Sequence, residues 1–386
     1  MDFIALGLDF VASGLAFVAP GLDFVATDLV FVARESTAVA GARSTGAKGY
    51  VGKAEKSASQ HQMKNRDFMR TAYCFTPDRA FFAPALRAIA SLIEAEPDGG
   101  HEIVLVCEPG DVPPGFDKLA GRLRDRIELM AIDFARFDKN LKPSGRFSRA
   151  VFRRLFLDEL LPARFERIVS VDSDMLIVRP GLKRLETFDL GGRPLAAAFD
   201  MIFYMDFKGG ALARQFQRTR RSLGLGLDTP YFNAGLMAID RAEWRRRALA
   251  EQVARALRDT PERFPFNEQD ALNATLHGDF APLSPRYNFM GDFFLIDLER
   301  RIEPIVLHFV NAPKPWELKL WRGEARFARD YRDWFAASPW PELAEAPSAP
   351  PWRRSRPPLT RVRQDFAKRL SLFIDRTRYI DGKLNL

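Results

Sequence analysis

The stretch from Ile168 to Val178 carries two carboxylates one residue apart, Asp172 and Asp174, between two runs of β-branched and apolar residues. Such runs are typical of buried strands, and alternate residues of a strand point to the same face, so the two carboxylates can converge. Neighbouring carboxylates repel each other unless a cation or a proton lies between them, and Mg²⁺ and Mn²⁺ prefer carboxylate oxygen. We therefore predict a metal site at a strand end. An isolated Asp-Ser-Asp is more often a polar turn, but polar turns seldom lie between two apolar runs.

Strand-like and helix-like segments alternate from residue 70 onward. Residues 71–76, 101–108 and 126–133 have strand character, and residues 83–96 and 148–165 show the three-four apolar spacing of helices. Strands separated by helices predict the α/β class, with a mostly parallel sheet between layers of helices. Functional groups in such folds lie at the carboxyl ends of strands, which is where the two carboxylates fall.

Residues 1–68 differ from the rest of the chain in composition. Residues 1–34 repeat a heptad-like unit (GLDFVAS, GLAFVAP, GLDFVAT, DLVFVAR), and residues 35–68 are rich in Ala, Gly, Ser and Lys. The spacing alone would suit a coiled coil, but the repeated glycines and Pro20 oppose a helix. We expect a low-complexity repeat and flexible linker, either disordered or read through from an upstream start codon, with Met63 and Met69 as alternative starts.

Charge and cysteine content restrict the partners and the compartment. The net charge of +8 favours anionic partners, but nucleic acid is not expected because aromatic and basic residues do not interleave outside the tail. Cys74 and Cys107 lie in apolar, strand-like runs rather than at metal-ligand spacing, which predicts buried thiols in a cytoplasmic protein. No stretch approaches the roughly 20 apolar residues of a membrane span.

Seven motifs carry a family resemblance. They are SRAVFRRL, VDSDMLIV, AAAFD, YFNAGLMAID, NEQDALN, YNFM and HFVNAPKPW. In this order the motifs resemble glycosyltransferase family 8, the retaining enzymes that include bacterial lipopolysaccharide glucosyl- and galactosyltransferases and glycogenin. The resemblance implies one nucleotide-diphospho-sugar transferase domain of the GT-A, Rossmann-like type over residues 70–320. Residues 321–386 would then be a helical, Pro-rich and basic C-terminal extension.

The resemblance also implies roles for individual residues. Asp172, Asp174 and His308 would hold Mn²⁺, or Mg²⁺, against the diphosphate of a UDP-sugar, and Lys314 would meet the phosphates. A mixed oxygen and imidazole set suits Mn²⁺ chemically. The remaining implied contacts are the nucleotide base for Asp78, the diphosphate and sugar for Arg154, and the donor sugar for Asp200, Asn233, Ala234, Glu268 and Gln269. The implied reaction moves a hexose of the glucose or galactose type to a glycan or lipopolysaccharide acceptor.

The family retains the configuration of the anomeric carbon, which permits two mechanisms. One passes through a covalent intermediate on the enzyme, and the other attacks from the face that UDP leaves. Gln269 offers a neutral amide oxygen, a poor nucleophile, so we favour same-face attack. In that mechanism Gln269 and the nearby carboxylates of Glu268, Asp270 and Asp200 steady an oxocarbenium-like transition state. Capping of a helix is the alternative role for the residues around Gln269.

Two other functions compete with sugar transfer. The Asp-Ser-Asp site would also suit a metal-dependent phosphohydrolase, although Leu176 stands where an aspartate-nucleophile phosphatase would have threonine. A basic module that binds an anionic polymer is the other alternative. A dinucleotide-dependent oxidoreductase is not supported, since no strand is followed by a GxGxxG turn.

The tail from Arg361 to Arg378 interleaves basic and apolar side chains. This pattern suits peripheral contact with the anionic inner face of the cytoplasmic membrane. A solvated helix that packs its apolar face on the main domain would show the same pattern, so both interpretations stay open.

Overall fold

The computed structural model describes residues 70–138, 140–145, 147–207, 209–295, 298–312, 314–317, 327–345 and residue 370. All of them belong to one structural unit, Met69–Leu386. The predictions for residues 1–68 and for the basic side chains of the tail lie outside the described residues. The domain limits at residues 70–320 and 321–386 stay predictions.

Seven strands form the central sheet, in the order β3-β2-β1-β4-β7-β6-β8. They are β1 (Thr71–Phe75), β2 (Glu102–Cys107), β3 (Ile127–Ala131), β4 (Arg167–Val171), β6 (Leu195–Phe199), β7 (Phe232–Asp240) and β8 (Ala281–Leu283). Neighbouring strands are parallel except around β7, which runs antiparallel to β4 and to β6. The predicted α/β class with a mostly parallel central sheet is confirmed.

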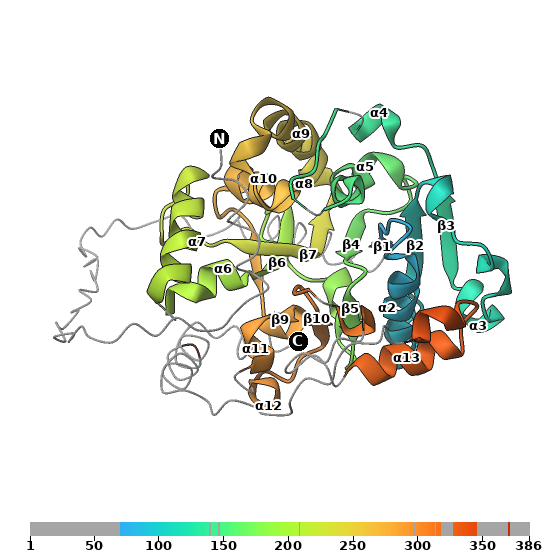
Figure 1. Cartoon of the computed structure of the whole chain (residues 1–386). Coiled ribbons are helices and arrows are strands. Elements are labelled where there is room, and N and C mark those ends of the chain that lie inside the picture. Colours follow the sequence, from blue (N-terminus) through green and yellow to red (C-terminus); the bar gives the residue numbers. More distant parts are fainter. Residues whose placement is uncertain are drawn as a thin grey trace, which may run out of the picture. The chain divides into compact units, whose positions relative to one another are not determined.

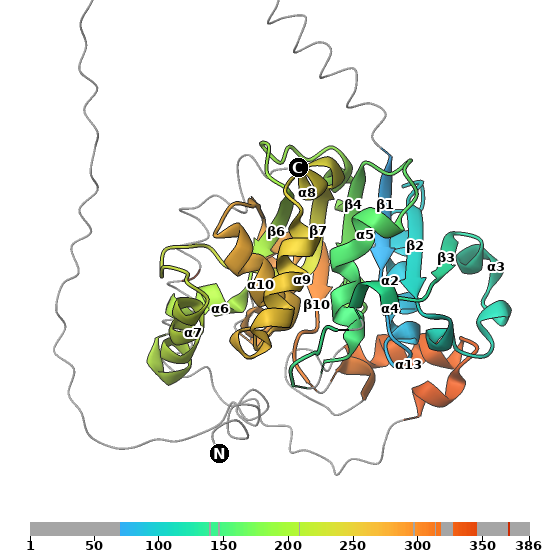
Figure 2. The same ribbon diagram turned by 90° about the horizontal axis from the view of Figure 1, so that it is seen from above.

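Helices cover both faces of the sheet, so most of its strand residues are buried and apolar. All residues of β1 are buried, and so are Ile103 to Cys107 of β2. Figures 1 and 2 show helices α5, α8, α9 and α10 over one face and α2 over the other. A sheet covered on both sides reads as near-continuous Val, Ile and Leu runs, which is why its strands are recognisable in the sequence.

A second sheet of three short strands lies beside the first. It has the order β5-β10-β9, with β5 (Met175–Ile177), β9 (Phe289–Met290) and β10 (Val306–His308). Strand β10 is antiparallel to β5 and parallel to β9. Only residues 172–174 separate β4 of the large sheet from β5 of the small one, so the chain passes directly from one sheet to the other.

Helices of four to fourteen residues pack around these sheets. The α-helices are α2 (Phe82–Ala95), α3 (Gly121–Arg124), α4 (Ala135–Asp138), α5 (Leu157–Leu160), α6 (Met201–Tyr204), α7 (Gly210–Ser222), α8 (Arg241–Arg246), α9 (Leu249–Asp259), α10 (Asn267–Leu276), α11 (Asp292–Leu295), α12 (Glu299–Ile302) and α13 (Ala328–Ala336). Short 3₁₀ segments include η3 (Arg149–Phe156), η4 (Leu182–Glu186), η8 (Pro315–Glu317) and η10 (Pro341–Ala344). Within the described residues, none of the helices has the length and apolar character needed to cross a membrane.

The helix predicted over residues 148–165 differs in type from the observed one. Residues Arg149–Phe156 wind as the 3₁₀ helix η3, and only Leu157–Leu160 are α-helical. The adjacent Arg153 and Arg154 are both buried but serve different partners, the loop after β1 and the loop after β4. A 3₁₀ helix turns 120° per residue, so neighbouring side chains diverge more than in an α-helix. The 3₁₀ winding is thus compatible with two adjacent buried arginines that reach separate partners.

Candidate active site

Asp172 and Asp174 lie in the turn between β4 and β5, at the carboxyl end of β4 as predicted. Strand alternation does not bring them together, because β4 ends at Val171 and the turn itself carries both carboxylates. The N–H of Asp172 donates to Gly235 O over 2.8 Å, and the C=O of Asp174 accepts from Phe309 N over 3.0 Å. The turn is thus tied to both sheets, and the predicted convergence is observed for a different structural reason.

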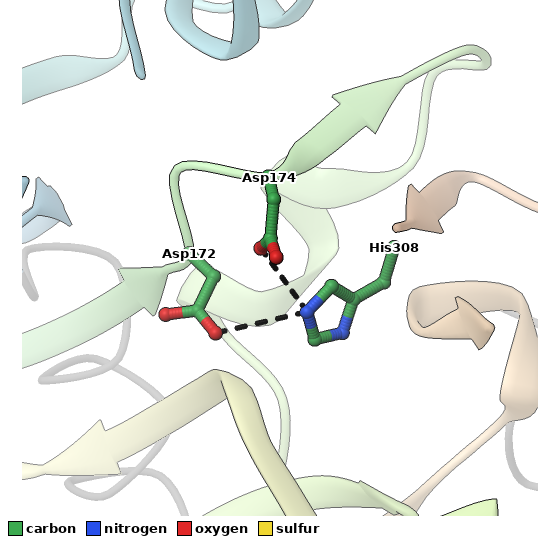
Figure 3. A group of neighbouring side chains, drawn as sticks. All are labelled: Asp172, Asp174 and His308. Atoms are coloured by element: carbon green, nitrogen blue, oxygen red, sulfur yellow. Dashed lines mark ion pairs between the residues drawn. The ribbon is translucent and has the colours of Figure 1, made fainter. Parts of the chain in front are cut away.

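His308 completes a cluster with the two carboxylates. It is the last residue of β10, where it pairs with Met175 of β5. Its Nε2 lies 3.2 Å from Asp174 Oδ1 and 3.7 Å from Asp172 Oδ2 (Figure 3). One ligand atom from each of the three residues lies within 4.8 Å of the others, which is close enough for a single metal ion to bridge them. The donor set of two carboxylates and an imidazole fits Mn²⁺ and related divalent ions.

The hydrogen bonds behind His308 determine which ring nitrogen faces this cluster. The N–H of Gly235 can only donate, so the Asn233 atom 2.9 Å from it is the oxygen. The Asn288 atom 2.8 Å from that oxygen must therefore be the amide nitrogen, which leaves Asn288 Oδ1 to accept from His308 Nδ1 over 2.8 Å. The ring is held with its Nδ1 proton directed at Asn288, and Nε2 points at Asp172 and Asp174, the orientation that a metal ligand needs.

Each carboxylate of the cluster also has a cation beside it. Lys314 Nζ lies 2.7 Å from Asp174 Oδ2. Arg154 donates to Asp172 and, over 2.6 Å, to the carbonyl oxygen of Ala234, while its Nε lies 3.4 Å from Glu268 Oε1. A single guanidinium therefore joins the end of β4, the start of β7 and the first turn of α10.

These surroundings move the carboxyl pKa values in opposite directions. Burial raises the pKa of Asp172, with Arg154 acting against it. Asp174 is also partly buried, but Lys314 and His308 more than offset this burial and hold its pKa below the ordinary range. Burial raises the pKa of Glu268 to about 7, although Arg154 opposes the rise. The site thus contains one carboxyl with a lowered pKa, Asp174, and one with a pKa near neutrality, Glu268.

The antiparallel direction of β7 brings its amino end to the edge at which β4 and β6 end. Asn233 and Ala234 consequently lie beside Asp172 and Asp200. Asp200 Oδ2 accepts from Asn233 Nδ2 over 2.7 Å and from Gln269 Nε2 over 3.3 Å. Gln269 Oε1 in turn accepts from Ala234 N over 3.0 Å. The structure therefore joins these predicted residues in one buried network.

The carboxylates of Asp270 and Asp78 have hydrogen-bond partners other than Asn233, Ala234 and Gln269. Asp270 is fully buried, and its two oxygens accept from Tyr231 OH and Phe266 N, each over 2.6 Å. Burial raises the pKa of Asp270 to about 7. Asp78 follows β1 at the same edge, but its carboxylate accepts from Phe81 N, at the start of α2, over 3.0 Å. It is not joined to the network by the hydrogen bonds of the described residues.

Three residues of this network were missed in the sequence. Tyr231 donates to Asp270, Asn288 orients His308, and Gly235 makes room for the cluster. A Cβ on Gly235 would stand 2.4 Å from His308 Cε1 and 2.9 Å from Asp172 Oδ2. The available signal was a glycine inside an apolar strand, which often marks close approach of another group. A single asparagine in YNFM carries no comparable signal.

Comparison with known proteins identifies the family of the chain. The family model for Glycosyl transferase family 8 matches residues 71–319. General stress protein A of Bacillus subtilis is 25% identical over 206 residues, which are 49% of this chain and 66% of that protein. Lipopolysaccharide glucosyltransferase WaaO of Escherichia coli is 23% identical over 238 residues, which are 59% of this chain and 66% of WaaO.

A solved structure has the same fold. The galactosyltransferase LgtC, crystallised with donor and acceptor sugar analogs, superposes with a TM-score of 0.56 at 21% identity. The superposition covers 72% of this chain and 97% of LgtC. At this identity the likeness concerns the fold, whereas the family model spans more than half of the chain. The chain therefore belongs to glycosyl transferase family 8.

Proposed function

We propose that the protein is a retaining glycosyltransferase that moves a hexose of the glucose or galactose type from a UDP-sugar to a glycan or lipopolysaccharide acceptor. Family membership supports sugar transfer, and the name of WaaO associates that relative with lipopolysaccharide. The observation that carries the proposal is the cluster of Asp172, Asp174 and His308, with Nε2 of His308 aimed at two partly buried carboxylates.

A divalent ion would be held by these three residues. Mn²⁺ or Mg²⁺, when bound, supplies positive charge to the diphosphate of the donor. Asp174 is the better prepared of the two carboxylates, because Lys314 and His308 keep its pKa low. Arg154 holds the carboxylate of Asp172 in place. The carboxylate oxygens of both aspartates are therefore oriented before an ion binds.

Lys314 contributes a second positive charge at the same point. Its ammonium group lies 2.7 Å from Asp174 Oδ2 and also donates to the carbonyl oxygen of Phe309. A diphosphate at the cluster would lie within reach of this ammonium. Positive charge fixed beside a leaving phosphate favours breakage of the glycosidic bond, because negative charge collects on that phosphate in the transition state.

The contacts of Gln269 support attack from the face that UDP leaves. Its oxygen accepts from Ala234 N, and its nitrogen donates to Asp200 and to Tyr231. An amide oxygen that already accepts a hydrogen bond is a weaker nucleophile still, which disfavours a covalent intermediate on it. The neighbouring carboxylate of Asp200 can then steady positive charge on the sugar, and a phosphate oxygen of the leaving group can take the proton of the acceptor hydroxyl.

The proposal includes two further predictions. The protein is expected in the cytoplasm, and its basic tail is expected to contact an anionic membrane. The basic side chains concerned lie outside the described residues. The membrane contact is tested by comparing how the full chain and a chain ending at residue 351 bind anionic vesicles, and equal binding would contradict it.

Titration calorimetry with nucleotides tests the central proposal. We expect UDP to bind more tightly than ADP or GDP, and to do so only when Mn²⁺ or Mg²⁺ is present. Asp174→Asn should abolish metal-dependent binding and transfer while the circular dichroism spectrum is kept. The exposed Asp98→Asn serves as the matched control. Metal-independent UDP binding, or near-normal transfer by Asp174→Asn, would contradict the proposal.

A further inference from the structure

Helix α13 lies beyond the region that the family model matches, yet one of its residues reaches the candidate site. Tyr331 of α13 is fully buried. Its ring centroid lies 5.0 Å from that of Trp316 and 6.0 Å from that of Phe309. These two aromatic residues flank Lys314 in the chain. One side chain of α13 therefore packs on both ends of the loop that carries the lysine.

Phe309 connects this packing to the metal cluster. It directly follows His308, its N–H donates to the carbonyl oxygen of Asp174 over 3.0 Å, and its own carbonyl oxygen accepts from Lys314 Nζ. A change in the position of Phe309 would be passed through its backbone to two of the proposed ligands and to the lysine. Tyr331 and the neighbouring Phe327, whose ring centroid is 5.3 Å from that of Phe309, hold that position.

The position of α13 is itself fixed by contacts away from the loop. Arg87 of α2 forms a bidentate pair with Asp330, with both N–O distances 2.9 Å, and the Arg87 side chain is only 8% exposed. Farther along, Trp340 Nε1 donates to the carbonyl oxygen of Pro114, after β2, over 2.9 Å. Figure 1 shows α13, in red, beside α2. Because paired bonds of this kind fix orientation, Tyr331 is held on a rigid support.

The same packing reaches the loop that carries Asp78. Trp316 also meets Phe81 edge to face, at a centroid distance of 5.7 Å. The backbone N–H of Phe81 is the donor to the Asp78 carboxylate. The column Tyr331–Trp316–Phe81 thus joins the two loops that the proposed function assigns to the phosphates and to the base of the nucleotide.

We infer that Tyr331 is a positioning residue for the nucleotide site, a statement that rests on the proposed function for the identity of the ligand. Its aromatic ring, rather than its hydroxyl, does the positioning. The hydroxyl is buried and has no hydrogen-bond partner among the described residues. Helix α13, which lies outside the residues that the family model matches, thereby sets the geometry of the loop that carries Lys314.

Three variants separate positioning from general stability. Tyr331→Leu removes the ring, Tyr331→Phe removes only the hydroxyl, and Phe335→Leu removes a second buried ring of α13. Phe335 packs on Tyr331 and Trp334, with centroid distances of 6.1 Å and 5.5 Å, and is the matched control for lost core packing. Hydrogen exchange of the free protein over residues 309–317, and UDP affinity with Mn²⁺, are measured for each variant.

We expect Tyr331→Leu to speed exchange over residues 309–317 and to weaken UDP binding by about tenfold or more, since small misplacements of a binding group cost this much. Tyr331→Phe should behave as the wild type in both measurements. Phe335→Leu should lower the melting temperature as Tyr331→Leu does but leave the exchange of the loop and the affinity unchanged.

Unchanged loop exchange in Tyr331→Leu, or equal effects of Tyr331→Leu and Phe335→Leu, would overturn the inference. A wild-type protein that binds no UDP would instead refute the proposed function. Because the exchange measurement needs no ligand, it still decides whether Tyr331 holds the loop.

Discussion

Asn288 Oδ1 accepts the Nδ1 proton of His308 over 2.8 Å, and the amide of Asn288 is oriented by Asn233. Asn233 is oriented in turn by the Gly235 N–H and by Asp200. The chain of amides has a single consistent direction, from the imidazole to a carboxylate. The position of the Nδ1 proton of His308 is therefore set by residues that are not themselves among the three proposed ligands.

Asn288→Leu tests this relationship. Leucine keeps the branched shape of the side chain, with bulkier methyl groups, but removes the acceptor, so the Nδ1–H of His308 is no longer held and Nε2 is not kept pointing at the two carboxylates. We expect Mn²⁺ affinity to fall by about ten- to a hundredfold, as for other residues that orient ligands. Calorimetry measures the affinity, and ¹⁵N resonances of the metal-free imidazole report the tautomer. Unchanged affinity together with an unchanged tautomer would contradict the assigned role.

Gly235→Ala should damage the cluster by crowding. Its Cβ would stand 2.4 Å from His308 Cε1, closer than real contacts allow, so the imidazole must shift. We expect a loss of metal affinity and of transfer by about tenfold or more, with a modest fall in stability of about 1–3 kcal/mol from overpacking. Gly110→Ala is the control, because a Cβ there meets nothing within 4 Å. Normal Mn²⁺ binding by Gly235→Ala would argue against this arrangement.

Arg154→Leu should be strongly destabilising. It leaves the partly buried Asp172 and the buried Glu268 close together without their shared cation, and loss of one partner of a buried pair costs about 3–5 kcal/mol. Arg154→Lys should recover only part of this free energy, because one ammonium cannot replace a planar group with several donors. Urea unfolding measures the difference. Arg255→Leu, which removes an exposed pair with Glu251, should cost less than about 1 kcal/mol. Equal costs at both sites would show that the buried contacts of Arg154 contribute nothing.

Glu268 predicts a pH dependence of stability. Its pKa rises from 4.5 to about 7 on folding, so the folded protein holds this proton more tightly than the unfolded chain does. The resulting stabilisation is complete below pH 4.5 and is lost as the pH rises through 7. Glu268→Gln mimics the protonated group, and we expect it to match the wild type near pH 4.5 and to exceed it above pH 7 by up to about 3 kcal/mol.

Unfolding free energies of the wild type and Glu268→Gln at several pH values provide the measurement. The exposed Glu262→Gln should show a constant difference from the wild type over the same range. A constant difference for Glu268→Gln as well would mean that this carboxyl does not titrate near neutrality.

The strands of the sheet could be predicted because burial on both faces leaves long apolar runs in the sequence. The direction of β7 could not, since a run such as FNAGLMAID reads the same whether its neighbours are parallel or antiparallel. That direction matters, because it places Asn233 beside Asp200. Short-range pattern therefore identifies elements, while their orientation depends on pairings far apart in the chain.

The site shows the same division. Asp172 and Asp174 were found by their chemistry, but the reason given for their convergence was wrong, since a turn and not a strand carries them. His308 was found only through the family resemblance, because a histidine more than 130 residues away has no local link to the carboxylates. Asn288 was missed because hydrogen-bond direction is a property of the folded network.

The turn at residues 172–174 links two different sheets, and this has a consequence for folding order. A chain that has formed only the seven-stranded sheet has Asp172 in place, but His308 arrives only when β10 pairs with β5. The complete ligand set therefore exists only in molecules whose two sheets have docked. An ion that binds this set would stabilise the docked arrangement of the two sheets, so the unfolding temperature would rise with ion concentration. The same binding would lower the population of chains in which only one sheet has formed, and with it their aggregation.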